Sequence, residues 1–442
     1  MSGIKKALVV GLCLAAAFSL LLLGVPRPPQ QGAFREYLES NDRFGTKFFK
    51  DLHAAAPDKN TVFSPLGIYS FFACLRELAG WDEELDRAFG WRPGQELGSA
   101  HRQLMARFTT LPPLLPERER SEAALKRYRE LEAKGGDNPW KNFEMFYRFE
   151  ERKTIAKREE LRLDNSIRYH GPLTPRAFQL EALRRAKEDF GLELAEVSDD
   201  EEWREIISGF PGGAALLDEG QGGRIFFLTS TLHLGTKWEF GLFLHVESKQ
   251  RDFYPKPGSP VTVRMVTSEL TDYPYARTDD YEAVVLPAMK ADFVVVMPEP
   301  GRSLGALEER FADSPDLLAS RLERRCGDVE LPEFKFKTDY SARPILEGLG
   351  VRTVFKDLGR IVLIPDSRFI DVRQAVSIVV DADGIQADSE TASIALLGGM
   401  RGGERPFHMK VNRPFLFQIR DNMTGALLFM GAVVDPSRHD LN

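Results

Sequence analysis

The sequence predicts an α+β fold, with helices crowded into the first half of the chain and strands dominating the second half. Two observations support this division. Apolar residues recur at helical spacing over 34–52 and again over 178–190, whereas short apolar segments of strand length follow one another from Arg224 onward. With 442 residues, 43% of them hydrophobic and 28% charged, the chain is long enough to bury a large core.

The N-terminal segment is expected to direct export. Lys5 and Lys6 precede an apolar run over 7–25, and a Pro-rich linker at 26–33 follows. Residues 1–25 are either a signal peptide or an uncleaved membrane anchor, and we lean to the anchor because about 18 to 20 apolar residues suffice to span a bilayer. In both cases the rest of the chain would be secreted, extracellular or periplasmic.

The folded domain is expected to cover 34–442 and to begin with the helix 34–52. Ser64 is the expected N-cap of a second helix, with Pro65 at its first position. This helix is apolar nearly all round, so we expect it to be central. The charged stretch at about 112–160 is interpreted as a surface insertion of one or two helices and not as a second domain.

Strands are expected over most of the remaining chain. A strand at 163–169 precedes the helix 178–190, and the final two strands form a hairpin around a Gly-containing turn at 421–425. The predicted strands of the second half are 225–234, 261–266, 282–286, 293–297, 329–335, 376–380, 415–419 and 427–434.

Catalytic and nucleic-acid-binding functions are disfavoured. The sequence contains no GxSxG, HExxH, GxxxxGK[ST] or GxGxxG motif, so a hydrolase serves only as a control hypothesis, and neither a metal nor a cofactor is expected. Three widely spaced cysteines suggest neither a disulfide framework nor a metal knuckle. The net charge of -7 provides no basic field for nucleic acid.

Several segments, in order along the chain, resemble the serpin family. The similarity runs from about residue 34 to 437 and omits the charged insertion. The segments are 60–66 (NTVFSPL), 227–240 with Trp238, 328–336 (DVELPEFKF), 346–351 (LEGLGV), 412–417 (NRPFLF) and 424–436 (TGALLFMGAVVDP). The resemblance implies three β-sheets, eight or nine helices and an exposed reactive-centre loop.

The resemblance also implies a function. Serpins inhibit serine-type proteases: the protease cleaves the loop, becomes trapped as a covalent acyl-enzyme, and is carried along as the loop inserts into the main sheet. The chain is then expected to be a monomer whose partner is a target protease, with the membrane as a second contact if the N-terminal segment is not cleaved. The alternative is a non-inhibitory serpin-fold binding or surface protein.

The expected loop spans 382–407 and is rich in Gly, Ala and Ser. From Ile385 onward, every second residue is small or β-branched and uncharged, while the opposite face is mostly polar. This pattern suits a strand inserted with one face on the core, although an ordinary flexible surface loop is the simpler interpretation. The hinge residues are Ala382, Asp383, Gly384, Ile385, Gln386, Ala387, Asp388 and Ser389.

The scissile bond is located by the family's usual spacing from the hinge. Counting from Ala382 leads to Gly398-Gly399, or to Leu397-Gly398 if the hinge is one residue shorter. Glycine is a poor specificity anchor, so we favour Leu397 and a chymotrypsin- or elastase-like target. Arg401 would indicate a trypsin-like target, but it lies three residues too far along.

Two departures from the family pattern favour the alternative function. The hinge carries Ile385, Asp388 and Glu390 where small residues are usual. The buried Ser, Asn and His set that controls sheet opening in inhibitory members is also altered. The residues expected in this region are Ser64, Gly67, Ser230, Trp238 and either Arg373 or Gln374.

Overall fold

The structure is a computed structural model. It describes residues 32–79, 82–109, 161–170, 177–208, 224–238, 242, 248–318, 321–356, 367–382, 384–386 and 405–438. The export segment 1–25 and the insertion at 112–160 therefore lie outside the described residues. Among the described helices, none is long and apolar enough to cross a membrane.

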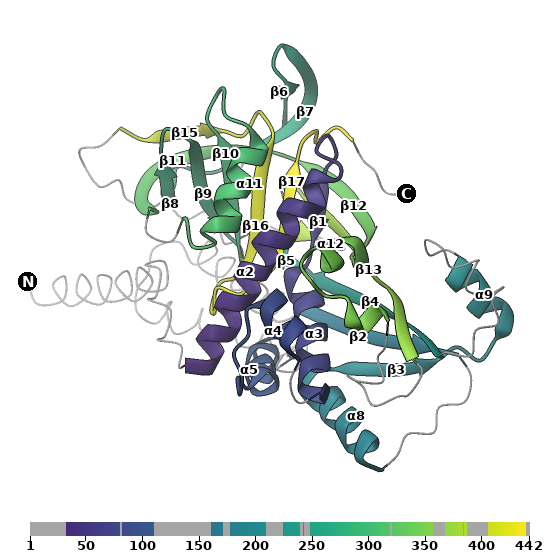
Figure 1. Cartoon of the computed structure of the whole chain (residues 1–442). Helices are drawn as coiled ribbons and strands as arrows, with labels where there is room; N and C mark the ends of the chain where they lie inside the picture. Colours follow the sequence, from purple (N-terminus) through teal and green to yellow (C-terminus); the bar gives the residue numbers. More distant parts are fainter. Residues whose placement is uncertain are drawn as a thin grey trace, which may run out of the picture.

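The α+β class is confirmed, and the helices lie mainly in the first half of the chain (Figure 1). The described ranges contain eight α-helices: α2 (Gly32–Ala54), α3 (Pro65–Ala79), α4 (Glu83–Phe89), α5 (Leu97–Thr109), α8 (Ala177–Phe190), α9 (Asp200–Ser208), α11 (Leu304–Asp313) and α12 (Arg343–Gly348). A short 3-10 helix, η1 (Thr353–Phe355), follows α12.

The first sheet contains the C-terminal hairpin next to its β1 edge. Its order is β1 (Thr61–Phe63), β17 (Leu427–Val433), β16 (Phe415–Asp421), β10 (Ala291–Pro298), β9 (Tyr281–Pro287), β8 (Thr271–Arg277), β11 (Glu323–Pro332), β7 (Ser259–Thr267) and β6 (Lys249–Lys256). Strand β15 (Phe407–Lys410) pairs with β11 in parallel. Because β11 pairs with both β8 and β7, it joins two groups of strands into one hydrogen-bonded sheet.

The second sheet forms a separate layer beside α3 (Figure 1). Its order is β3 (Leu192–Glu196), β2 (Leu161–Tyr169), β4 (Arg224–Leu234), β13 (Ser367–Val380), β14 (Gly384–Gln386) and β5 (Thr236–Lys237), and β12 (Phe334–Ser341) also pairs with β13.

Two predicted strand boundaries are wrong. The strand expected at 329–335 is divided at Glu333, whose backbone N–H turns to the Arg264 carbonyl, so β11 ends before β12 begins. Strand β13 starts well before 376, at Ser367, and its polar residue Asp371 is buried. Its carboxylate accepts a hydrogen bond from Ser341 Oγ at 2.6 Å.

Helix α3 is central, as predicted. Pro65 is its first residue, and its side chains from Leu66 to Leu75 are buried. The C-terminal hairpin packs closely behind it: a Cβ added to Gly431 would lie 2.6 Å from the Thr61 carbonyl oxygen. Only glycine therefore fits where β17 passes β1.

The beginning and the end of the domain are held together by side chains. Asn60 Oδ1 accepts hydrogen bonds from the backbone N–H groups of Val434 and Asp435, at 2.8 and 2.9 Å. Asn41 on α2 donates to the Leu427 carbonyl at 3.0 Å. Strand β1 pairs antiparallel with β17. Segments from the two ends of the sequence thus share one core.

A neutral histidine is buried between the helices. His101 on α5 is fully buried, its Nδ1 lies 2.8 Å from the Tyr37 hydroxyl, and its ring stacks on Phe190. Burial lowers the pKa of His101 from 6.5 to about 3. Because the unfolded chain takes up this proton first, the group's contribution to stability is complete above pH 6.5 and is lost as the pH falls toward 3.

We predict that His101→Gln, which cannot take up a proton, makes the domain less sensitive to acid. Between about pH 7.5 and pH 5, the wild-type free energy of unfolding should fall by roughly 2 kcal/mol more than that of the variant. Urea unfolding followed by circular dichroism at the two pH values measures the difference. An unchanged pH dependence in the variant would contradict this account.

Candidate functional site

The candidate site is a seam in the second sheet. Strand β13 runs parallel to β4 from the pair Ser367 and Arg224 to the pair Gln374 and Ser230. Beyond this stretch the two strands separate, and β14 lies between β13 and β5, the short strand that follows β4. A longer β14 would have to divide β13 from β4 along their whole pairing.

The hinge sits at the open end of this seam. Ile385 pairs with Val380 on β13 and with Thr236 on β5, and its side chain is only 2% exposed. The turn before it is tight, because the backbone N–H of Asp381 donates to the Gly384 carbonyl at 3.1 Å. The first strand residues of the hinge are therefore already in the sheet.

Trp238 holds the same turn. Its indole Nε1 donates to the Asp381 carbonyl at 2.8 Å, and its ring packs edge-on against Phe293. The expected buried tryptophan thus contacts the hinge. Of the other hinge residues, Ala382 is half-buried next to this turn, Gly384 is buried and Gln386 pairs with Val379. Asp383, Ala387, Asp388 and Ser389 lie outside the described residues.

Gln374 is the buried polar residue of β13. Its Oε1 accepts hydrogen bonds from the Ser64 N–H and the Tyr340 hydroxyl, both at 2.9 Å, and its Nε2 donates to the Ser64 carbonyl at 3.1 Å. Arg373 points the other way, where it is exposed and binds Asp339. Of the two residues, Gln374 is therefore the one whose side chain is buried.

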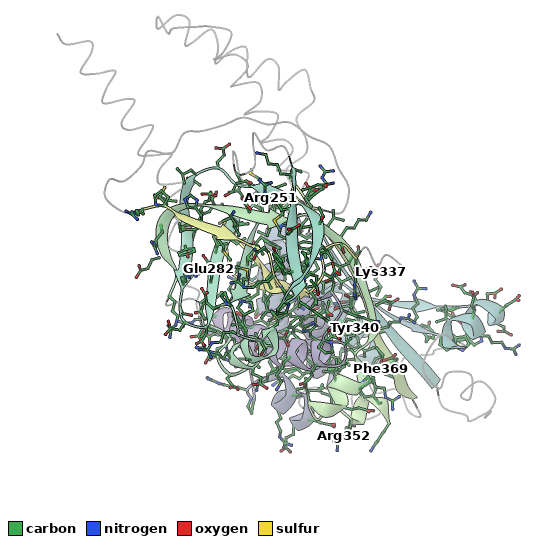
Figure 2. The ribbon with its side chains drawn as sticks, turned by 90° about the horizontal axis from the view of Figure 1, so that it is seen from above. Arg251, Glu282, Lys337, Tyr340, Arg352 and Phe369 are labelled. Atoms are coloured by element: carbon green, nitrogen blue, oxygen red, sulfur yellow. The ribbon has the colours of Figure 1, made fainter. Side chains whose placement is uncertain are left out.

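The partners of Gln374 are also fixed. Ser64 Oγ donates to the Leu428 carbonyl at 2.9 Å and accepts from the Gly67 N–H at 3.2 Å, so it caps α3, as predicted. Tyr340 lies within the body of the molecule (Figure 2). Burial raises the pKa of Tyr340 well above its usual range, so its hydroxyl remains a donor.

A second clamp, formed by Asn165 and Ser70, was not predicted from the sequence. Asn165 Nδ2 on β2 donates to Ser70 Oγ at 2.9 Å, and Ser70 Oγ donates to the Gly67 carbonyl at 3.1 Å. Asn165 shares a row with Ser230 and Gln374 across the sheet, although the side chain of Ser230 is not described. A signal was present, because Asn165 alternates with the apolar Leu163 and Ile167 on one face.

Helix α3 therefore bridges the seam. Ser64 ties it to β13, on one side of the opening line, and Ser70 ties it to β2, which is paired with β4 on the other side. Separating β13 from β4 would strain or break at least one of these clamps. Because the clamps are buried, a broken bond would leave polar groups without water.

The two ends of the loop are held on different sheets. Its first residues pair with β13, and β15, which follows it, pairs with β11. Across that parallel pair, His408 contacts Asp328, and Lys410 lies 3.8 Å from Glu330. The scissile-bond candidates Leu397, Gly398, Gly399 and Arg401 lie between these anchors, outside the described residues.

Comparison with known proteins points to one family. A family model described as "Serpin (serine protease inhibitor)" matches residues 215–436. Serpin-Z10 of Arabidopsis thaliana is 25% identical over 206 residues, which cover 43% of this chain and 52% of that protein. The chain spans about half the length, or less, of the first curated relatives that it matches.

Longer matches cover nearly the whole chain. Plasminogen activator inhibitor 1 of Mus musculus is 25% identical over 442 residues, which cover 96% of this chain and 100% of that protein. Among solved structures, human thyroxine-binding globulin in complex with thyroxine aligns with a TM-score of 0.66 at 16% identity, over 92% of this chain and 100% of that one. This likeness shows that the fold is shared.

We predict that Gln374→Leu strongly destabilises the sheet, because it leaves the Ser64 N–H and carbonyl and the Tyr340 hydroxyl without their buried partner. The free energy of unfolding should fall by roughly 2 to 4 kcal/mol. Arg373→Leu, one residue earlier on the exposed face, is the matched control and should cost less than about 1 kcal/mol. If urea unfolding shows that the two variants lose the same free energy of unfolding, the buried hydrogen bonds of Gln374 do not stabilise the sheet more than an exposed ion pair does.

Proposed function

We infer that this chain, which belongs to the serpin family, inhibits a serine-type protease through loop cleavage, covalent trapping and loop insertion. The family is described as one of serine protease inhibitors, and its members are not enzymes, although a thyroxine-binding globulin shares the fold. The observation that supports the mechanism best is the position of Ile385, buried between β13 and β5 as the first inward residue of a strand that could be extended.

The sequence beyond Ile385 suits such an extension. Continuing the alternation directs Ala387, Ser389 and Thr391 inward and the acidic Asp388 and Glu390 outward. An inserted strand adds backbone hydrogen bonds on both of its edges, each worth about 0.5 to 1.5 kcal/mol net. Cleavage frees the loop to form these hydrogen bonds, and the free energy that they release is the driving force that trapping requires.

The isoleucine at the hinge affects the intact protein, because it holds the start of β14 in the sheet. A small residue there could leave the sheet at little cost, whereas withdrawing a buried isoleucine exposes apolar surface worth about 1.5 to 3 kcal/mol. The β-branched side chain also suits a strand. Ile385 therefore keeps β14 paired with β13 and β5 before cleavage.

The proposed target is a chymotrypsin- or elastase-like protease that accepts Leu397. The apolar segment 7–25 supports a location outside the cell or in the periplasm, with the domain either released or held on a membrane. Whether that segment is cleaved stays a prediction.

A second candidate function is ligand or surface binding without inhibition. It is motivated by the long glycine-rich loop and by the similarity in fold to a thyroxine-binding globulin that was solved with its ligand. This candidate and the first differ in what a protease does to the loop: an inhibitor traps the enzyme, and a binding protein is only cut.

We predict a covalent complex with chymotrypsin or elastase. The full chain, incubated with chymotrypsin, elastase, trypsin or subtilisin, should give a band on a denaturing gel at the summed mass of protein and protease. Leu397→Arg should move complex formation from chymotrypsin to trypsin, because it changes only the residue that the protease recognises. Cleavage without adduct by all four proteases would favour the binding function.

We also predict that cleavage stabilises the protein. The cleaved chain should melt roughly 10 to 20 °C above the intact chain, as expected if the added backbone hydrogen bonds are together worth about 10 kcal/mol or more. Ala387→Arg directs a charge inward and should abolish both this shift and trapping, although the loop is still cut. The matched control is Asp388→Arg on the outward face, which should change little. Equal melting temperatures for intact and cleaved wild-type protein would reject insertion.

A further inference from the structure

His170 lies at the end of β2, directly after Tyr169, and both of its ring nitrogens face oxygen atoms. Its Nδ1 lies 2.6 Å from the Val197 carbonyl oxygen, and its Nε2 lies 3.0 Å from Asp200 Oδ1. Val197 precedes α9, and Asp200 is the first residue of that helix. One imidazole thus contacts both the approach to α9 and its first turn.

The two contacts fix the protonation state that suits this geometry. A carbonyl oxygen and a carboxylate oxygen both accept hydrogen bonds, and neither can donate one. A neutral imidazole donates through a single nitrogen, so it can satisfy only one of the two. The doubly protonated ring donates through both nitrogens and also carries the charge that attracts Asp200.

The ring also packs on the buried side of α9. Trp203 is 7% exposed, and its indole stacks on His170 with a centroid distance of 5.5 Å and an interplanar angle of 20°. A cation over an indole face is favoured over a neutral ring. Three contacts to the same segment therefore improve together when His170 gains a proton.

The surrounding charges are mainly acidic. Asp199 Oδ1 accepts from the backbone N–H groups of Glu201 and Glu202, at 2.9 and 2.7 Å, and caps α9. On β3, Glu196 pairs with Tyr169. The nearest described basic groups along the chain are Arg168 on β2 and Arg204 on α9, whereas the segment 196–202 carries five carboxylates.

We propose that His170 is a proton-dependent latch that fastens helix α9 to the ends of β2 and β3. Protonation of the ring engages Val197, Asp200 and Trp203 together, and loss of the proton releases one hydrogen bond and the charge attraction. Figure 1 shows α9 standing away from the helical core, at the end of this sheet. Docking of α9 strengthens in mild acid and weakens as the pH rises, the opposite direction to the effect of His101 on the core.

Hydrogen exchange of the backbone amides in 197–208 tests the latch in the full chain. After correction for the intrinsic pH dependence of exchange, local opening at about pH 5.5 should be roughly three- to fivefold rarer than at about pH 8, the two values lying on either side of the range in which histidines titrate. The expected change is modest because the Asp200 carboxylate is largely exposed to solvent. Equal opening at the two pH values would overturn the proposal.

Three variants separate the latch from general effects of pH. His170→Gln should remove the pH difference in α9, and its persistence there would overturn the proposal. His408→Gln removes a more exposed histidine that also contacts an aspartate, on β15, and should leave the α9 response intact. If His170→Gln leaves α9 open at both pH values, Asp200→Asn decides: a smaller pH response than wild type supports the latch, and an unchanged response rejects it.

Discussion

The clamp between Gln374 and the first residues of α3 is the interaction on which the rest of this structure depends. Ser64 is at once the cap of α3, a donor to the Leu428 carbonyl of the C-terminal hairpin and the backbone partner of the Gln374 side chain, so this contact fixes the start of the central helix against two strands. The same contact ties β13 to the start of α3. In the proposed mechanism, this set of buried hydrogen bonds keeps the sheet closed before cleavage and has to break if a strand enters.

Much of this could be predicted from the sequence, where local chemistry decides. The start of α3 follows from Ser64 and Pro65, and the final hairpin from its turn residues and apolar strands. The missed beginning of β13 and the missed Asn165 clamp have a common cause. Asp371 and Asn165 are polar residues on buried faces, and their partners, Ser341 and Ser70, lie far away in the sequence. No local pattern identifies a partner that only the fold supplies.

The candidate site could also be predicted only in part. Alternation placed Ile385 on the inward face, and the structure agrees. The choice between Arg373 and Gln374 needed the twist and pairing of β13, because two neighbours on a strand face opposite sides and only tertiary packing decides which side is buried. The two-acceptor environment of His170 likewise combines a strand end, a backbone carbonyl and a helix start that no sequence motif connects.

The union of both chain ends in one core has a consequence for synthesis. Strand β1 is made long before its partner β17, and the Val434 N–H that donates to Asn60 lies 374 residues further along the chain. Contacts of such long sequence separation carry a large loop-closure cost and form late. The central helix then remains without this covering while the intervening chain is synthesised, and its apolar surface is open to aggregation during that time.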